Sequence, residues 1–276
     1  MRGLGWKRDP LDIRDGKHAF STIRDSLAAT VPLLERASVR ERVVKMLNQG
    51  GAGTCVACAG MQAIRVAHVG ALLALTGSLE LARQSSELGS ILWGYFFARV
   101  PDHSTGYDSG CNLRSFFAAM GKLGLPPETL WPYSDSRVPG ARMFTFPSKS
   151  VFRAAYDQHC LNGYHRIDAV GSERKVDVML AIAAGKAVAA GWDVSQRFVD
   201  DAPDGIVLPL QPGEQIAGGH AMLMVGYEPE CLTICNSWGE GWGSDGGFFK
   251  ADWSWLDQAE DLWVVDSSPL FSEETP

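Results

Sequence analysis

The sequence predicts an α+β fold, in which a helical lobe precedes a strand-rich lobe. Two observations carry this prediction. Residues 49–135 contain apolar residues at three- and four-residue spacing, which is typical of helices. Five prolines lie between residues 126 and 147, and beyond residue 150 the apolar runs become short and are bounded by turn residues, as in strands. Because clefts between lobes commonly hold binding sites, we expect the functional site between the two lobes.

Four segments are expected within a single domain. Residues 1–48 form an N-terminal extension, and residues 49–135 form the helical lobe with the candidate nucleophile. Residues 136–266 form the β-rich lobe with the candidate base, and residues 267–276 form a frayed tail. No internal repeat is evident in the sequence.

The individual elements follow from start and stop signals. The extension is expected to hold a short charged helix over residues 39–47, capped by Ser38. The longest helix is expected over residues 56–75, directly after a glycine-rich turn, and two later helices are expected to end at Gly124 and Gly185. The remaining predicted elements are helices over residues 88–100, 113–123 and 172–184, the last capped by Ser172, and strands over residues 188–192, 221–227, 231–235 and 247–250.

Cys55 stands at the first turn of the predicted helix 56–75, because the glycines before it do not easily belong to that helix. A thiol becomes a good nucleophile only when it is ionised, and its unperturbed pKa lies near about 8.5. The positive end of a helix dipole and a nearby imidazolium both favour the thiolate. Cys55 is therefore the candidate nucleophile, and its base has to come from elsewhere in the chain.

His220 is the candidate base. It follows two glycines and opens a short apolar run that is typical of a buried strand, and Asn236 ends the next predicted strand. Strands joined by a short turn are expected to pair antiparallel, which brings the start of the first strand close to the end of the second. The Asn236 amide oxygen can then accept a hydrogen bond from one ring nitrogen of His220, which leaves the other nitrogen free to face Cys55.

Two further residues complete the predicted site. Acyl transfer develops negative charge on a carbonyl oxygen, which needs hydrogen-bond donors already in place. The side-chain NH2 of Gln49 and the backbone N–H of Cys55 are the candidate donors. Trp238 is expected to cover the contact between His220 and Asn236 and to exclude water, which strengthens that hydrogen bond.

Several segments of the chain together resemble the papain-like (C1) cysteine peptidases. The separation between Gln49 and Cys55 is similar to that between the oxyanion glutamine and the nucleophile of this family. The segments that carry the resemblance are residues 49–57, 219–221, 225–227 and 236–243, with further similarity in residues 108–110, 115–124 and 131–133. The resemblance covers roughly residues 49–249, and residues 5–10 and 13–15 are similar to the start of bacterial relatives.

This resemblance implies a papain-like two-lobe fold, with a helical lobe, an antiparallel sheet or barrel lobe, and the active site in the cleft between them. It also implies roles for four residues: Gln49 as oxyanion donor, Cys55 as nucleophile, His220 as general base and acid, and Asn236 as orienting residue. The substrate-binding residues that it suggests are Gly110 and Cys111 on one cleft wall, Gly219 and Ala221 on the other, and Trp238.

The sequence departs from the family pattern near the nucleophile. Val56 stands where the family usually has tryptophan. Ala52 and Asp108 stand at positions where many members have a bridged pair of cysteines, so that disulfide cannot form here. Cys111 replaces a usual cleft-wall glycine, and Gly219 leaves the neighbourhood of the histidine small and uncharged. These differences affect the expected cleft depth and substrate preference.

The cysteines also allow two other interpretations. Cys55 and Cys58 form a CxxC pair at a helix start, as in thiol–disulfide oxidoreductases, but no strand leads into it and no βαβ pattern surrounds it. Cys58 is instead expected to pack in the helix core. A zinc site would have to draw its ligands from Cys55, Cys58, Cys231, Cys235 and His220. It is disfavoured, because Cys231 and Cys235 are four residues apart in a strand and too far apart to bind one ion. No metal and no cofactor are therefore expected.

Composition excludes several classes of partner. The net charge of −7 and the absence of a basic stretch argue against nucleic-acid binding. The most apolar stretch, residues 66–76, contains His68 and is too short to span a bilayer, so no membrane partner is expected. Three acidic residues near the end of the chain, Asp252, Asp261 and Asp266, are expected to be solvated surface charges.

The cysteine content and the start of the chain bear on location. Six cysteines in 276 residues predict reduced thiols and no disulfide scaffold. Residues 1–15 are polar and charged, so no signal peptide is expected. Together these observations favour a cytoplasmic location, or export by a route without a cleaved signal.

The expected function is that of a cysteine endopeptidase that acts on polypeptides. Two alternatives remain open: an acyl transferase or deamidase that uses the same thiol, and a catalytically idle binding module. Residues 1–48 are too short for a long helical propeptide, so activity is not expected to be held off in that way. We expect this extension to strap across both lobes instead.

Overall fold

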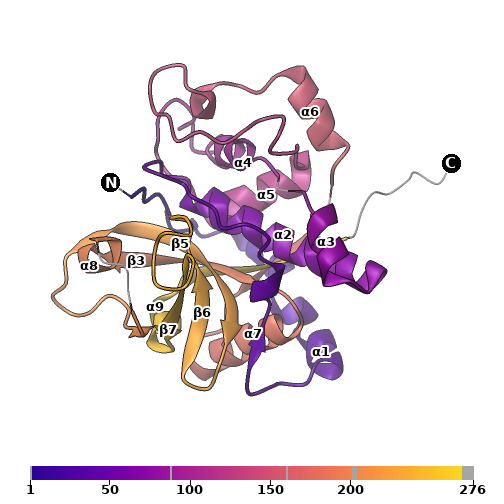
Figure 1. Ribbon diagram of the computed structural model, residues 1–276, viewed down its shortest axis with the longest axis vertical. Coiled ribbons are helices and arrows are strands. Elements are labelled where there is room, and N and C mark those ends of the chain that lie inside the picture. Colours follow the sequence, from indigo (N-terminus) through magenta and orange to yellow (C-terminus); the bar gives the residue numbers. More distant parts are fainter. Residues whose placement is uncertain (1, 88, 160, 201–203, 269–276) are drawn as a thin grey trace.

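The computed structural model describes residues 2–87, 89–159, 161–200 and 204–268. Figure 1 shows a group of helices on one side of the molecule and a strongly curved sheet on the other. The predicted α+β fold is therefore confirmed. Most of the predicted tail, residues 269–276, lies outside the described residues.

The helical part is built around α2 (Cys55–Thr76), which matches the predicted helix 56–75. This helix ends at Gly77, whose φ of 67° is the left-handed conformation that favours glycine after a helix. The helices around it are α3 (Leu79–Ser85), α4 (Ile91–Ala98), α5 (Leu113–Leu123), α6 (Lys149–Tyr156) and the short η3 (Arg142–Phe144). The predicted helix 113–123 is confirmed as α5, and the predicted helix 88–100 is shorter, because Ser90 caps α4 through the Trp93 N–H.

The sheet part contains one mixed sheet that is mostly antiparallel. Its strand order is β2-β8-β3-β5-β6-β7-β4, and β1 also pairs with β5. The pair β5 and β6 is antiparallel, as predicted, and only β4 pairs parallel, with β7, among the named strands of the described chain. The strands are β1 (Ala37–Ser38), β2 (Leu161–Ile167), β3 (Val188–Ser195), β4 (Ile206–Val207), β5 (Ile216–Tyr227), β6 (Cys231–Cys235), β7 (Phe248–Asp252) and β8 (Glu260–Ser267).

The sheet is flanked by α7 (Gly171–Ala183), α8 (Gln196–Asp200) and α9 (Ser254–Gln258), as Figure 1 shows. The predicted helix 172–184 is confirmed as α7, but Val170 and not Ser172 occupies the cap position. The sequences of β2 and β8 show no clear alternation of apolar and polar residues. The reason is that β8 is buried along most of its length and β2 along little of it.

Residues 2–48 contact both parts of the molecule. The elements here are η1 (Ile13–His18), α1 (Ser21–Thr30), β1 and η2 (Arg40–Arg42). The predicted helix over residues 39–47 is wrong beyond the short turn η2. Ser38 pairs with Gly226 on β5, and the Val39 N–H donates to the Val225 carbonyl, so pairing with the sheet edge replaces the local helix.

The prediction of solvated aspartates is wrong for two of the three. Asp261 is buried, and its carboxylate accepts hydrogen bonds from the Asp9 N–H and from Arg166. Asp266 is partly buried and forms ion pairs with His165 and Lys186. Burial of a carboxylate is tolerated when such donors replace its water shell.

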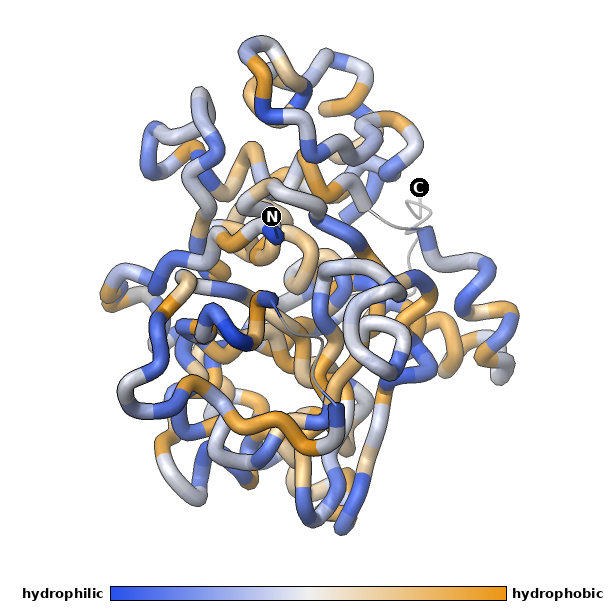
Figure 2. Tube along the Cα trace, turned by 60° about the vertical axis from the view of Figure 1, so that its left-hand side comes forward, coloured by the Kyte–Doolittle hydropathy of each residue, from blue (hydrophilic) through white to orange (hydrophobic). Residues whose placement is uncertain are grey.

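The centre of the molecule is apolar. Figure 2 shows hydrophilic residues along most peripheral loops and hydrophobic residues concentrated in the interior of the trace. By length and composition α2 alone among the helices of the described chain could cross a membrane, but 67% of its apolar window is buried within the protein, as in a core helix. The five described cysteines are free, and Cys160 lies outside the described residues.

Helices α2 and α4 approach the Phe116 ring of α5 through glycines. A Cβ at Gly60 would lie 2.3 Å from a ring carbon of Phe116, and a Cβ at Gly94 would lie 2.4 Å from another. Side chains in close-packed interiors do not tolerate such distances. The two glycines therefore set how closely the helices pack around the phenyl ring.

We expect Gly60→Ala to lower the free energy of unfolding by about 1–3 kcal/mol, because overpacking against Phe116 outweighs the gain in helix propensity of about 1 kcal/mol. The matched control is Gly121→Ala on α5, where the nearest atom to a new Cβ lies at 3.6 Å. The control should be neutral or stabilising in urea unfolding. An equal increase in stability for both variants would contradict the close packing at Gly60.

Candidate active site

The candidate site depends on a seam between the two parts of the molecule. Residues 47–49 come just before the turn of residues 50–54 that leads into Cys55, which we call the nucleophile turn. They lie against residues 237–239, just after β6. The Gln49 N–H donates to the Ser237 carbonyl at 2.8 Å, and the Gly239 N–H donates to the Leu47 carbonyl at 2.9 Å. Asn48 and Trp238 form an antiparallel bridge between these bonds. We call residues 47–49 and 237–239 the seam.

Cys55 is the first residue of α2 and is fully buried. The backbone N–H groups of Ala221, Gly5, Val56 and Trp6 lie near its thiol and favour the thiolate. Burial is nevertheless the largest effect and raises the pKa of Cys55 to about 11. The contact with Ala221 places the thiol beside the strand that carries His220.

The imidazole of His220 is oriented by Asn236. The antiparallel pairing of β5 and β6 brings the two residues together, with His220 Nε2 at 2.7 Å from Asn236 Oδ1. The same oxygen accepts the Ser237 N–H at 2.7 Å, which fixes the amide orientation. Because Asn236 Oδ1 is only an acceptor, Nε2 carries the proton of the neutral ring. The other nitrogen, Nδ1, is buried and has no hydrogen-bond partner among the described residues.

Trp238 lies over His220, as the sequence predicts. The two rings are stacked, with 4.5 Å between their centroids and 18° between their planes. His220 is fully buried, and this burial lowers its pKa to about 4, while the bond to Asn236 partly opposes the shift. Cys55 and His220 are therefore both neutral at pH 7 in this state, because desolvation disfavours either charge.

Gln49 lies at the seam, close to the start of α2. Its side-chain oxygen accepts the Ser237 hydroxyl at 2.5 Å, and its side-chain nitrogen donates to the carbonyls of Ala52 at 2.8 Å and Gly3 at 3.0 Å. Ser237 thus orients the side-chain amide of Gln49. The sequence alone indicates no such role for Ser237, although it directly follows Asn236. One donor of Gln49 points at a carbonyl that enters the site from the extension.

Residues 3–7, which we call the cleft segment, lie in the cleft between the two parts. Their backbone groups form hydrogen bonds with both predicted walls of the cleft, at Gly219 on β5 and at Cys111 on the opposite loop. The bonds are Gly3 N–H to Gly50 O (2.9 Å), Gly5 N–H and Trp6 N–H to Gly219 O (3.0 and 3.1 Å), Cys111 N–H to Gly5 O (2.9 Å) and Lys7 N–H to Cys111 O (3.0 Å). Nothing in the helical or strand periodicity of the sequence signals this location.

The predicted substrate-binding residues line the cleft segment in different ways. A Cβ at Gly110 would lie 2.1 Å from the Gly5 carbonyl oxygen, so the absence of a side chain there allows the close approach. Cys111 contacts the segment through its backbone N–H and carbonyl, and the residue is fully buried. Ala221 contacts the Cys55 thiol through its backbone N–H, and Trp238 lies under the Arg2 guanidinium at 5.3 Å from the ring centroid.

Asp108 ties the nucleophile turn to the cleft wall. Both of its carboxylate oxygens accept the Gly53 N–H at 3.1 Å, and the Tyr95 hydroxyl donates to one of them. The Gly110 N–H in turn donates to the Tyr95 oxygen at 3.0 Å. Arg99 stacks over Tyr95 at 3.8 Å and brings a positive charge to this buried network. The resemblance indicates Asp108 as part of the similar segment 108–110 and as the place of a missing cysteine, and implies no such network for it.

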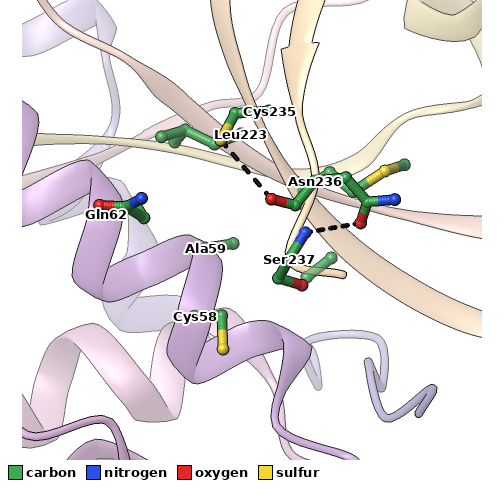
Figure 3. A pocket seen from close by; sticks show the side chains of 9 residues that line it. Cys58, Ala59, Gln62, Leu223, Cys235, Asn236 and Ser237 are labelled. Carbon is green, nitrogen blue, oxygen red and sulfur yellow. Dashed lines mark hydrogen bonds between the residues drawn. The ribbon is translucent and has the colours of Figure 1, made fainter. Parts of the chain in front are cut away.

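A small cavity lies behind this site, between α2 and the strands β5 and β6. Figure 3 shows Cys58, Ala59 and Gln62 of α2 on one side and Cys235, Asn236 and Ser237 on the other. Its volume of about 10 Å³ is room for one water molecule at most. The cavity is therefore too small for a substrate, and Cys58 is buried beside it.

Comparison with known proteins gives one family. The sequence model described as "Papain family cysteine protease" matches residues 97–254, more than half of the chain. This range includes His220 and Asn236 but not Cys55 or Gln49, whose assignment therefore depends on the geometry above.

Similar proteins agree with this match. The structure of xylellain, a cysteine protease from Xylella fastidiosa, is similar with a TM-score of 0.78 and 27% identity over 96% of each chain. The structure of digestive procathepsin L2 from Tenebrio molitor is similar in fold, with a TM-score of 0.68 and 20% identity over 96% of this chain and 78% of that one. An uncharacterized peptidase C1-like protein of Acanthamoeba polyphaga mimivirus is 25% identical over 83% of this chain and 73% of its own length.

The raised thiol pKa predicts the pH dependence of alkylation. A group with a pKa of about 11 is almost wholly protonated at pH 7, so iodoacetamide should label Cys55 slowly. The rate should rise about tenfold per pH unit from pH 6 to pH 10, because only the thiolate reacts. Mass spectrometry locates the label. A rate that levels off below pH 8 would show that the thiolate already forms in this state.

Proposed function

The chain belongs to the papain family of cysteine proteases, and from this premise we propose that it hydrolyses peptide bonds with Cys55, His220, Asn236 and Gln49 as its catalytic residues. The observation that carries the proposal is the hydrogen bond between His220 Nε2 and Asn236 Oδ1, which leaves Nδ1 without a hydrogen-bond partner among the described residues. His220 belongs to the strand that contacts the Cys55 thiol through Ala221. A base held in one tautomer beside a thiol at a helix start is the arrangement that thiol acyl transfer needs.

In the first step His220 Nδ1 takes the proton of the Cys55 thiol, and the sulfur attacks the carbonyl carbon of the substrate. Asn236 Oδ1 stabilises the imidazolium that forms, since it accepts the Nε2–H bond throughout. The ionised pair needs water or substrate dipoles near it, because full burial raises the thiol pKa and lowers the imidazole pKa. The reactive state is therefore one in which the cleft segment has moved away.

Negative charge then develops on the substrate carbonyl oxygen. The Gln49 side-chain N–H that now donates to the Gly3 carbonyl is the donor available for this oxygen, together with the Cys55 backbone N–H. Ser237 keeps the Gln49 amide in position through its hydroxyl. His220 returns its proton to the leaving amine, and water, deprotonated by His220, releases the acyl group from the sulfur.

We infer cleavage within chains, because the cleft admits backbone on both sides of the nucleophile. The cleft segment extends from Gly3 at Gln49, past the thiol at Gly5 and Trp6, to Lys7 at Cys111. A polypeptide that follows the same path has residues on both sides of the reacting bond. This geometry supports an endopeptidase over an enzyme that only trims chain ends.

Release of fluorescent peptides from labelled casein tests the proposal. His220→Ala should abolish the release, and Gln49→Ala should lower kcat about 10²–10³-fold, because one oxyanion donor is lost. Gln84→Ala, on the exposed face of α3, is the matched control and should match the unmodified chain. Equal activity of the Gln49→Ala and control variants would rule out the oxyanion role.

The products separate peptide hydrolysis from the other reactions of the same thiol. Hydrolysis gives new amino termini. An acyl transferase would instead give adducts with an added amine, and a deamidase would release ammonia without chain cleavage. If a peptidyl epoxide labels no cysteine and none of these products forms, the binding-module reading replaces the proposal.

A further inference from the structure

Two buried thiols that the proposed reaction does not use lie near the Cys55 thiol. Cys58 and Cys111 are free and almost without exposed area. Burial is the largest cause that raises the pKa of each, and the charge of a Cys55 thiolate is the second. Both thiols are therefore close enough to Cys55 for its charge to act on them.

Cys58 follows Cys55 by one turn of the same helix, α2. The Cys58 N–H donates to the Thr54 carbonyl at 2.9 Å, so this first turn is a regular α-helical turn. In such a turn, Cα atoms three residues apart are separated by about 5 Å. Disulfide bonds join Cα atoms that are roughly 4.4–6.8 Å apart. The backbone at the start of α2 is therefore already within bridging distance.

The two side chains need only a small approach. Cβ atoms three residues apart on a helix are separated by about 5–6 Å, and a disulfide needs about 3.5–4.5 Å. The Cys55 N–H belongs to the first four N–H groups of α2, which in any helix lack an acceptor one turn earlier, so this end adjusts more easily than the middle. Cysteines with this spacing at helix starts form and break disulfides in thiol–disulfide oxidoreductases.

Cys111 is less well placed to bridge to Cys55. It lies on the loop before α5, and its N–H and its carbonyl both form hydrogen bonds with the cleft segment, at Gly5 and Lys7. Gly110 before it has a φ of 70°, and a Cβ there would lie 2.1 Å from the Gly5 carbonyl oxygen. A bridge at Cys111 would therefore require this wall to move together with its partners.

The electrostatics set the order in which the two thiols of α2 react. Peroxides oxidise thiolates, and burial raises the pKa of Cys55 to about 11, while burial and the Cys55 charge raise that of Cys58 further. Cys55 is therefore oxidised first. Its conversion to a neutral sulfenic acid removes the charge that opposes a thiolate at Cys58, and the Thr54 hydroxyl near the Cys58 thiol favours that thiolate.

We propose that Cys55 and Cys58 form a reversible disulfide that protects the nucleophile from irreversible oxidation. In the first step a hydroperoxide oxidises the Cys55 thiol to a sulfenic acid and is itself reduced to an alcohol or to water. In the second step the Cys58 sulfur attacks the Cys55 sulfur, the S–O bond breaks, and the hydroxyl leaves as water with the Cys58 proton. Excess thiol reductant then restores both thiols and is itself oxidised to a disulfide.

The protective role rests on the proposed function, because it takes Cys55 as the nucleophile. The bridge itself depends only on the two thiols. A bridged chain has no free sulfur at Cys55, so it cannot attack a carbonyl until a reductant opens the bridge.

Treatment of the full chain with hydrogen peroxide, followed by dithiothreitol, tests the proposal. Cys58→Ala removes the second thiol and keeps a small side chain in the helix, and Cys58→Ser repeats the test if the alanine variant does not fold. Cys231→Ala is the matched control, because Cys231 is also buried and free but lies on β6. Trypsin leaves Cys55 and Cys58 in one peptide, residues 46–65, so a bridge between them makes that peptide two hydrogens lighter.

The unmodified chain and the control should both give this lighter peptide after peroxide. Dithiothreitol should then restore iodoacetamide labelling of Cys55 almost completely in both. In Cys58→Ala, Cys55 should instead gain two or three oxygens, and the recovered labelling should be at least about fivefold lower, because no neighbouring thiol intercepts the sulfenic acid. Tandem mass spectrometry assigns the oxygens to Cys55 and not to Met46 or Met61 of the same peptide.

The other outcomes count against the proposal or against the function. A bridge that joins residues 46–65 to residues 100–114 would make Cys111 the partner and overturn the assignment of Cys58. Equal recovery of Cys58→Ala and the control, or a sulfinic acid without any bridge in the unmodified chain, would refute the reversible disulfide. If the bridge forms but casein is never cleaved, the proposed function fails and the bridge stands. If casein is cleaved but dithiothreitol does not reverse the peroxide inactivation, the bridge fails and the proposed function stands.

Discussion

The pairing of the seam is the constraint on which the rest of the site depends. The thiol is on a helix and the imidazole is on a sheet, and each lies in a different part of the fold. Residues 47–49 and 237–239 join these parts through two backbone hydrogen bonds and the bond between the Gln49 amide and the Ser237 hydroxyl. The seam includes Gln49, the proposed oxyanion donor, and Ser237, the residue after Asn236, so the same contacts fix the turn before Cys55 and the amide that orients the imidazole.

The cleft segment explains why the reactive groups are neutral in this state. A thiol and an imidazole that share a water-free site cannot both be charged without strong compensation. The segment lies over Cys55, and its backbone N–H groups only partly offset the effect of burial on the thiol, while His220 is buried against Trp238. While the cleft segment is in place, the proposed nucleophile and base therefore stay neutral.

The sequence predicts the elements near the motifs well and the long-range contacts poorly. Helices α2 and α5 and the pair β5 and β6 follow from periodicity and turn residues. The helix expected over residues 39–47 does not form, because Val39 bonds to an edge of the sheet that no local pattern reveals. Asp261 is buried by residues far away in sequence, and Trp6 enters the cleft through contacts with Gly191 and Gly219. Such positions depend on packing between distant segments, which spacing alone does not encode.

The Asp108 network has a consequence for the conditions under which the enzyme can work. Members of the family with a cystine at this place need an oxidised scaffold next to a nucleophile that must stay reduced. Here a carboxylate, a phenol and backbone amides make the link, and the five described cysteines are free. Hydrogen bonds do not respond to electron supply, so an excess of thiol reductant protects Cys55 without loosening the wall beside it. The Cys55 thiol and the hydrogen bonds of Asp108 beside it therefore both persist under the same reducing conditions.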